Sequence, residues 1–289
     1  MKMLVTGATG KLGTKVVEAL LKTVPASELV VSVRNPEKAA GLKARGVEVR
    51  QGDFDHSETL TTAFAGIDRL LIISADGDNE TRIRQHTNAV ASAKLAQVKF
   101  IAYTSLVNAS GSSLFLAPVH RATEEAILKT GISYSFLRNN WYLENEIGNI
   151  QGVLSGAPWV TAAGTGKVGW ALQQDYAEAA AAVLSGSGHE NTIYELSGKS
   201  RTQEELASIL GAVLGKEVLV QQVDDATYAN IMKGAGVPDF VIPMLVDIQK
   251  GIRDGALDIE NNDFKTLLGR SPTPLNTALA QIVRGISQA

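Results

Sequence analysis

The chain has 289 residues, 45% of them hydrophobic, which is enough to bury one large core or two modest ones. Its formal net charge is −3 without blocks of like charge, which argues against a nucleic-acid partner. Cysteine is absent, which excludes disulfides, thiolate metal sites and a cysteine nucleophile, and no apolar run is long enough to span a bilayer.

The first predicted element is a short apolar strand at residues 3–5, followed by a glycine turn and by a helix with one apolar face. The turn contains Gly7, Gly10 and Gly13, spaced G-x-x-G-x-x-G rather than in the commoner G-x-G-x-x-G pattern. A dinucleotide pyrophosphate lies against the backbone N–H groups that open a helix only where no side chain intervenes. The position between strand and helix therefore favours a cofactor loop over an ordinary turn.

Strands and helices then alternate through the first half of the chain. We predict strands at residues 29–33, 47–50, 69–73, 100–104 and 132–137, and helices at residues 37–44, 57–64, 80–96 and 117–129. Strands that are apolar on both faces and separated by helices imply a parallel sheet covered on two sides. We therefore expect an α/β protein with a Rossmann-type, doubly wound parallel sheet, in which ligands bind beyond the carboxyl ends of the strands.

The alternation loosens after residue 137. We predict short strands at residues 159–162 and 168–172 around a glycine turn, a helix at 176–184, a last sheet strand at 193–196 and a strand at 217–223. Thr202 and Glu205 form a capping-box pattern that opens a helix through Leu214. We expect residues 1–142, completed by about 168–198, to form the dinucleotide-binding domain, and residues 143–167 and 199–289 to form a smaller, mostly helical region that covers the substrate.

Arg34 stands at the end of the second predicted strand. NAD-binding chains usually place an acidic residue there to hold the ribose 2′-hydroxyl, whereas an arginine suits a 2′-phosphate. Arg34 therefore predicts NADP, with a solvated surface arginine as the alternative.

Two further strand ends carry candidate cofactor contacts. Asp53 and Phe54 follow the third strand, where a carboxylate would accept from the adenine amino group and a ring would pack beside it. The alternative for Asp53 is a cap on the next helix. Ser74 and Ala75 follow the fourth strand, and their small side chains would let the backbone approach the cofactor.

Several motifs together resemble one family over essentially the whole chain. They are Thr6-Gly-Ala-Thr-Gly-Lys-Leu-Gly13, Arg34-Asn-Pro, Gly52-Asp53-Phe54, Leu137-Arg-Asn-Asn-Trp-Tyr142 and Asp175-Tyr-Ala-Glu-Ala179. The chain resembles the NmrA-like branch of atypical short-chain dehydrogenases, and within it bacterial NAD(P)H:quinone oxidoreductases and triphenylmethane reductases.

The resemblance implies NADPH (NADP) as the cofactor and assigns its contacts. The implied pyrophosphate loop consists of Thr6, Gly7, Ala8, Thr9, Gly10, Lys11, Leu12 and Gly13. Arg34 would hold the 2′-phosphate, and Ser74 and Ala75 the adjoining ribose. The implied nicotinamide end consists of Leu137, Arg138, Asn139, Asn140, Trp141 and Tyr142. One departure is Gln173-Gln174, where quinone-reducing relatives commonly carry an arginine, and this would remove a charged cofactor contact.

The chemistry is inferred partly from an absence. Ordinary short-chain dehydrogenases use a tyrosine with a lysine four residues later, and no tyrosine here has that lysine. Reduction of a quinone needs no such acid, because hydride transfer gives a stabilised phenolate-like anion. The protein then mainly holds the nicotinamide ring against the quinone ring.

Ser105, after the fifth strand, and His120, near the start of a helix, are the candidate catalytic donors; the alternatives are a turn serine and a structural histidine. The other histidines, His56, His86 and His189, have no converging neighbours and are interpreted as surface or packing residues without metal-ligand spacing.

Two functions remain in competition. The first is an NADPH-dependent oxidoreductase that transfers hydride to a quinone or similar conjugated aromatic acceptor, and the second is a non-catalytic NADP-binding redox sensor of the NmrA type. A nucleotide-sugar epimerase is disfavoured because it needs the missing tyrosine. We expect a cytoplasmic monomer or homodimer with a small, planar acceptor and with neither membrane nor nucleic-acid partners.

Overall fold

In the computed structural model, which describes residues 1–288, the chain divides into two compact units. The first unit consists of Met1–Ser110, Leu116–Asn139 and Gln174–Tyr194. The second consists of Gly111–Phe115, Asn140–Gln173 and the described residues from Glu195 onward. None of the described helices is both long enough and apolar enough to cross a membrane.

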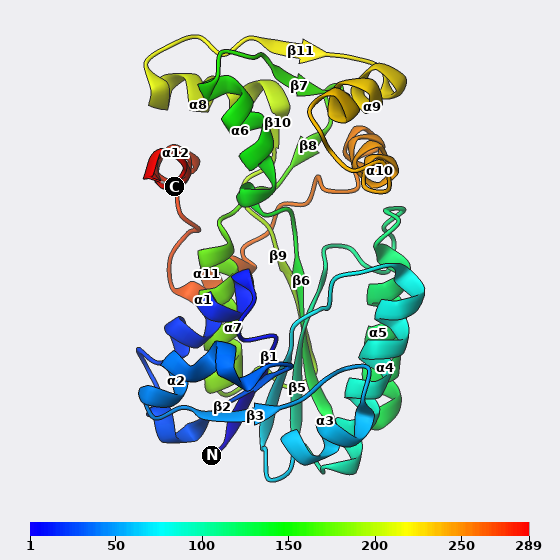
Figure 1. Ribbon diagram of the computed structural model, residues 1–289, viewed down its shortest axis with the longest axis vertical. Coiled ribbons are helices and arrows are strands. Elements are labelled where there is room, and N and C mark those ends of the chain that lie inside the picture. The colour runs from blue at the N-terminus through cyan, green and yellow to red at the C-terminus, as the bar shows by residue number, and fades with distance from the viewer. Residues whose placement is uncertain (289) are drawn as a thin grey trace. The chain divides into compact units, whose positions relative to one another are not determined.

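The first unit is built on a seven-stranded sheet with the strand order β3-β2-β1-β4-β5-β6-β9 (Figure 1). The strands are β1 (Met3–Thr6), β2 (Leu29–Val33), β3 (Glu48–Gln51), β4 (Arg69–Ile72), β5 (Phe100–Leu106), β6 (Ser133–Asn139) and β9 (Thr192–Leu196). Every pairing from β3 across to β6 is parallel. The predicted doubly wound parallel sheet is confirmed.

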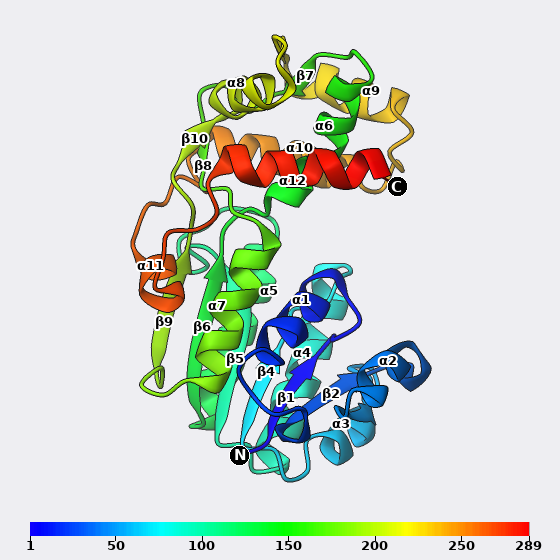
Figure 2. The ribbon, with the colours of Figure 1, turned by 90° about the vertical axis from the view of Figure 1, so that its left-hand side faces the viewer.

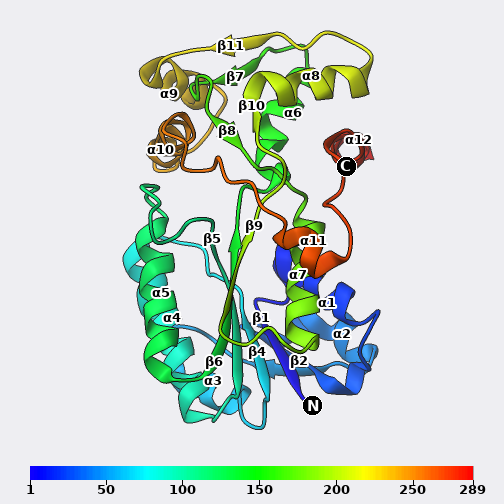
Figure 3. The same ribbon diagram turned by 180° about the vertical axis from the view of Figure 1, so that it is seen from behind.

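Helices cover both faces of this sheet, as Figures 2 and 3 show. They are α1 (Lys11–Leu20), α2 (Ala40–Ala44), α3 (Ser57–Ala63), α4 (Asn79–Leu95), α5 (Ala117–Thr130) and α7 (Gln173–Ser185). Helices α1 and α7 lie on one face, and α3, α4 and α5 lie on the other. Strands β1, β2, β4 and β5 are buried along their whole length because both of their faces are covered.

The second unit is mostly helical. Its helices are α6 (Ile147–Leu154), α8 (Gln203–Leu214), α9 (Asp225–Gly234), α10 (Ile242–Arg253), α11 (Asp263–Leu268) and α12 (Leu275–Gln288). Two short sheets join distant segments: β7 (Trp159–Thr161) pairs with β11 (Val220–Gln222), and β8 (Lys167–Val168) pairs with β10 (Arg201–Thr202). The buried indole N–H groups of Trp159 and Trp170 donate to Gln203 and Glu146.

Two predicted elements differ clearly from those observed. The helix expected at residues 37–44 begins as a 3₁₀ turn, Pro36–Ala39, which Asn35 caps, and continues as α2. The strand expected at residues 168–172 ends at Val168, and the strands on either side of the glycine turn each pair with a distant segment. In that turn, Gly166 packs so closely on the backbone of Ile252 in α10 that no side chain fits.

The capping box at the start of α8 is present as predicted. The Thr202 side chain accepts from the Glu205 N–H at 3.2 Å, and the Glu205 carboxylate accepts from the Thr202 N–H at 2.8 Å. Each bond satisfies a backbone donor that would otherwise have no partner within the helix.

We therefore expect Thr202→Ala to lower the free energy of unfolding by about 1 kcal/mol, because one N-terminal donor of α8 loses its acceptor. Thr202→Ser keeps the hydroxyl and should cost much less. Urea denaturation followed by circular dichroism measures both, and equal losses in the two variants would contradict the capping role.

Candidate active site

The turn between β1 and α1 presents a helix N-terminus without a side-chain cap. Gly7 has φ +60°, a left-handed conformation that favours glycine, and its carbonyl accepts from the Gly10 N–H at 2.9 Å. Gly10 is the N-cap residue, and the first turn of α1 contains no acidic side chain. Gly7, Thr9, Gly10 and Lys11 are exposed. The N–H groups that open α1, beginning with that of Lys11, are therefore available to an anion.

The remaining four residues of the predicted loop are buried and pack beneath it. Thr6, Ala8, Leu12 and Gly13 are buried. A Cβ on Gly13 would overlap the carbonyl oxygen of Gly7, so α1 can approach the turn only because residue 13 is glycine. The structure thus brings all eight predicted loop residues together and leaves four of them facing solvent.

The predicted adenosine contacts lie at the ends of β2 and β3. Arg34 is exposed, and within the described part of the chain it forms no ion pair. The Asp53 carboxylate accepts from the Asp55 N–H at 3.0 Å and lies 3.3 Å from Nδ1 of His56. Asp53 does not cap α3, because His56 is the N-cap residue. An adenine contact for Asp53 and for the half-buried Phe54 stays a prediction.

The segment after β4 is held from inside by side chains of its neighbours. Three consecutive backbone N–H groups donate inward: Ile73 to Oγ1 of Thr6 at 3.0 Å, Ser74 to Oγ1 of Thr104 at 2.9 Å, and Ala75 to Nε2 of His86 at 2.9 Å. These bonds satisfy the N–H groups that β4 leaves unpaired where it ends. The backbone of Ser74 and Ala75 is consequently fixed before any ligand binds.

A buried polar cluster lies behind this segment and contains two histidines. His86 is 0% exposed, and since its Nε2 accepts from Ala75, its Nδ1 carries the proton and donates to Thr123 Oγ1 at 2.8 Å. Nδ1 of His120 lies 2.9 Å from the Tyr103 hydroxyl, and its Nε2 faces Nη2 of Arg82 at 3.5 Å. Burial, together with the nearby Arg82 cation, lowers the pKa of each histidine to about 3, and burial raises the pKa of Tyr103 to about 12.

The expectation that His86 has no converging neighbours is wrong. Tyr103 from β5 and Thr123 from α5 both contact it, with a ring distance of 5.7 Å to Tyr103. The sequence signal was weak, because the three residues come from different elements. Sequence reasoning also passed over Arg82 and Glu124, which occupy helical positions that resemble any charged surface residue.

Ser105 belongs to a second buried cluster. It lies within β5, which extends to Leu106, and not after the strand as predicted. Its hydroxyl donates to Oε1 of Glu124 at 2.6 Å, and Arg138 donates to both oxygens of Glu124 at 2.9 and 2.7 Å. All three side chains are less than 10% exposed. The guanidinium of Arg138, a predicted cofactor contact, is therefore paired inside the protein.

The predicted nicotinamide segment begins in β6 and continues beyond it. Leu137 and Asn139 are buried in the last part of the strand. The side chain of Asn140 donates to Ser197 at 2.9 Å and to the carbonyl of Leu257 at 3.0 Å. Trp141 and Tyr142 are half-buried, which leaves them the more accessible side chains of this segment.

The Gln173-Gln174 departure lies at the start of α7. The Gln173 N–H donates to the Glu144 carboxylate at 3.0 Å, and the Gln174 side chain donates to Glu178 at 3.0 Å. Glutamine thus supports the helix start locally, and the predicted loss of a charged cofactor contact at this position is untested.

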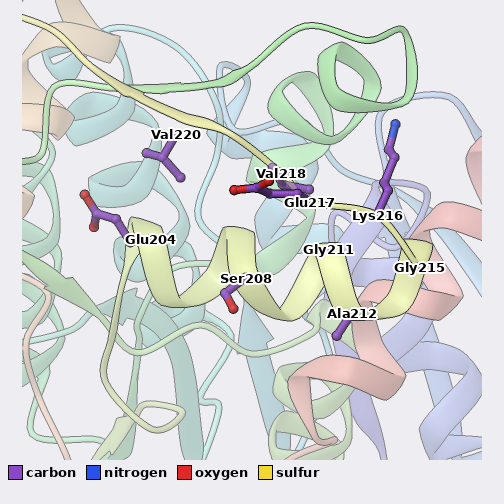
Figure 4. Close-up of a pocket in the computed structure, with 9 residues that line it drawn as sticks. All are labelled: Glu204, Ser208, Gly211, Ala212, Gly215, Lys216, Glu217, Val218 and Val220. Atoms are coloured by element: carbon purple, nitrogen blue, oxygen red, sulfur yellow. The ribbon is translucent and has the colours of Figure 1, made fainter.

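Other features lie outside the predicted site. A hollow of about 620 Å³ in the second unit lies along α8, between Glu204 and Lys216, and contains none of the predicted residues (Figure 4). Among residues 1–288, no group of three or more histidines or carboxylates is arranged to hold a metal ion.

The lowered histidine pKa values predict an acid-sensitive fold. A histidine in the unfolded chain titrates near pH 6.5, whereas His86 and His120 titrate at about 3, so between these values the unfolded chain binds more protons. The stability gained from their neutral rings is complete above about pH 6.5 and is lost as the pH falls toward 3. Going from pH 7 to pH 5 should cost about 2 kcal/mol for each ring.

Urea unfolding at the two pH values tests this. The drop in unfolding free energy should be about 2 kcal/mol smaller in His86→Gln than in the wild type. His56→Gln changes an exposed ring and should leave the drop unaltered. An identical drop in wild type and His86→Gln would contradict the assignment of a neutral buried ring.

Comparison with known proteins places this chain in a family. The profile of the NmrA-like family matches residues 1–261. Quinone oxidoreductase 2 of Escherichia coli is 43% identical over 279 residues, which cover 96% of this chain and 97% of that protein. Crystal structures of Citrobacter triphenylmethane reductase with NADP(H) and of the E. coli NADPH-dependent quinone oxidoreductase with NADPH are each 42% identical and superpose with TM-scores of 0.94 and 0.93.

The structural likeness extends over nearly all of each chain. The triphenylmethane reductase match covers 98% of this chain and 100% of that one, and the quinone oxidoreductase match covers 97% and 99%. The family match, the sequence identity and the sheet topology agree with the resemblance seen in the sequence motifs. The chain belongs to the NmrA-like family.

Proposed function

We propose that the chain is an NADPH-dependent oxidoreductase that transfers hydride to a quinone or a similar conjugated aromatic acceptor. The observation that carries the proposal is the exposed, uncapped N-terminus of α1, followed at the end of the neighbouring strand by an exposed Arg34 that has no ion-pair partner among residues 1–288. It occurs in a chain 43% identical to a quinone oxidoreductase. The acceptor is a small molecule in this proposal, and a cytoplasmic monomer or homodimer stays a prediction.

The residues present fit a phosphorylated dinucleotide. The N–H groups that open α1, beginning with that of the exposed Lys11, would hold the pyrophosphate, since the N-cap residue Gly10 provides no side-chain cap. Arg34 would pair with the 2′-phosphate in a charge-assisted hydrogen bond. The fixed backbone of Ser74 and Ala75 would hold the adjoining ribose. The nicotinamide would lie by the segment from Leu137 to Tyr142.

The proposed chemistry needs little from the protein beyond positioning. NADPH, when bound, supplies the hydride, and the acceptor anion that results takes its proton from water. Holding reacting atoms about 3–3.5 Å apart lowers a barrier by roughly 7–11 kcal/mol. Tyr103, with its pKa raised to about 12, is fully buried and is not a substitute for the tyrosine acid of ordinary short-chain dehydrogenases.

The two candidate donors fit a supporting role better than direct proton donation. The Ser105 hydroxyl donates to Glu124, and the neutral ring of His120 has its Nδ1 2.9 Å from the Tyr103 hydroxyl. We propose that Ser105 and His120 hold the ends of β5 and α5 in place around the predicted nicotinamide end of the site, residues 137–142. Measuring turnover after replacing either side chain tests whether that side chain contacts the acceptor directly.

Replacing Arg34 with alanine should weaken NADPH binding about 10- to 100-fold, since one hydrogen-bonded charge pair is worth about 1.5–3 kcal/mol. NADH, which lacks the 2′-phosphate, serves as the control and should bind the variant as it binds the wild type. Calorimetric titration measures both constants, and equal losses for the two cofactors would remove Arg34 from the 2′-phosphate site.

Replacing Gly10 with valine should abolish NADPH binding while leaving the melting temperature within a few degrees, because the branched side chain would occupy the pyrophosphate position. A single Cβ at this position would lie 3.2 Å from the Gly7 carbonyl oxygen, so Gly10→Ala is the milder matched variant and should retain weak binding. Unchanged NADPH affinity in Gly10→Val would show that the loop is misassigned.

The function itself is tested by mixing the protein with NADPH and 1,4-benzoquinone and following the absorbance of reduced cofactor. We expect turnover above the uncatalysed rate for the wild type and none for Gly10→Val. Binding of NADPH without turnover of any conjugated acceptor would favour the redox-sensor alternative.

A further inference from the structure

Two arginines of the first unit are equally buried but differ in their partners. Arg138 is 8% exposed, and its guanidinium donates to both oxygens of Glu124. Arg82, in the first turns of α4, is 6% exposed and donates from Nη2 to Ser74 Oγ at 2.8 Å. Its other contact is Nε2 of His120, at 3.5 Å, and its Nε has no hydrogen-bond partner.

The positive charge of Arg82 is therefore not neutralised within the described part of the chain. Neither of its partners is a carboxylate, and the acidic groups that act on it are the Tyr103 hydroxyl and, more weakly, the exposed Asp76. Burial lowers the pKa of Arg82, which is the expected response of a cation that has lost water without gaining a counter-ion. The neighbouring rings of His86 and His120 are neutral, so Arg82 is the cluster's sole charge. An unpaired buried charge of this kind indicates an absent anionic partner.

The position of Arg82 relative to the sheet limits the chemistry of the absent partner. Its anchor, Ser74, follows the carboxyl end of β4, which is the edge where open parallel sheets bind ligands. The phosphates of a dinucleotide are already accounted for at the ends of β1 and β2, by the α1 N-terminus and Arg34. Strand β4 lies on the side of β1 away from β2, next to β5. Beyond β5 follows β6, which begins the predicted nicotinamide segment. A nicotinamide riboside carries no anionic group, so an anion arises there only on the acceptor.

We propose that Arg82, held in place by Ser74, binds the acceptor oxygen on which negative charge develops. This inference rests on the proposed reductase function. In the step, the acceptor gains a hydride with its electron pair, NADPH is oxidised to NADP⁺, and the quinone becomes a hydroquinone monoanion. The guanidinium stabilises the new phenolate oxygen until it takes a proton from water.

The experiment measures binding of a phenolate as well as turnover. Calorimetry on the NADP-loaded protein uses pentafluorophenolate as the charged probe and pentafluoroanisole as the neutral one. The wild type should bind the phenolate at least about tenfold more tightly. Arg82→Gln should lose this preference, and its kcat with 1,4-benzoquinone should fall about 100-fold, while its NADPH affinity changes less than about threefold.

Matched variants separate this role from a structural one. Arg84→Gln removes an exposed arginine of the same helix, paired with Asp55 at 2.7 Å, and should change neither quantity. Arg82→Lys keeps the charge and should keep most of the phenolate preference, which preserves the test if Arg82→Gln does not fold.

The outcomes also separate the inference from the function. A phenolate preference that survives in Arg82→Gln, or one absent from a wild type that reduces quinone, overturns the inference alone. A preference that depends on Arg82 in a protein that reduces no quinone supports the anion site and overturns the reductase assignment. Loss of NADPH affinity in Arg82→Gln, with the phenolate preference intact, would assign Arg82 to the cofactor instead.

Discussion

The arrangement of the site depends on a helix that begins without a protein cap. The first N–H groups of α1 carry a partial positive charge, and in most helices a side chain of the N-cap residue would satisfy one of them. Here the N-cap residue is Gly10, and the glycine at 7 turns the chain with φ +60°. Gly13 lets the helix pack directly on the carbonyl of that turn. The helix end therefore stays open to an anion while the loop remains rigid.

At the end of β4, in contrast to the start of α1, protein side chains satisfy the backbone N–H groups. The N–H groups of residues 73–75 are satisfied from within by Thr6, Thr104 and His86, so the backbone of this segment is fixed. The cost is a set of polar groups in the core, and it is tolerable because most of them are hydrogen-bonded to one another. One edge of the sheet thus combines an uncapped helix end with a neighbouring segment whose backbone is rigid.

Buried, mutually paired side chains stand where ordinary short-chain dehydrogenases carry the Tyr–Lys pair. The region that carries those residues in ordinary short-chain dehydrogenases contains, in this chain, two internally paired groups. One joins Ser105, Glu124 and Arg138, and the other joins Tyr103, His86 and His120. Their titratable members are buried, and the two histidines are neutral, so neither group is built to exchange protons with a substrate. An acceptor that needs only hydride and positioning is compatible with such a site.

The sequence by itself determined the strand and helix alternation, the glycine turn before α1 and the capping box at Thr202, because each depends on neighbours within a few residues. Glycine spacing and apolar runs reflect the conformation of the local backbone, which does not depend on where the segment lies in the fold. The sequence did not reveal that His86 meets Tyr103 and Thr123, that Arg138 is paired with Glu124, or that Arg82 lacks a counter-ion. Those facts depend on side chains brought from different strands and helices, and only the tertiary structure decides which charges meet and which remain unpaired.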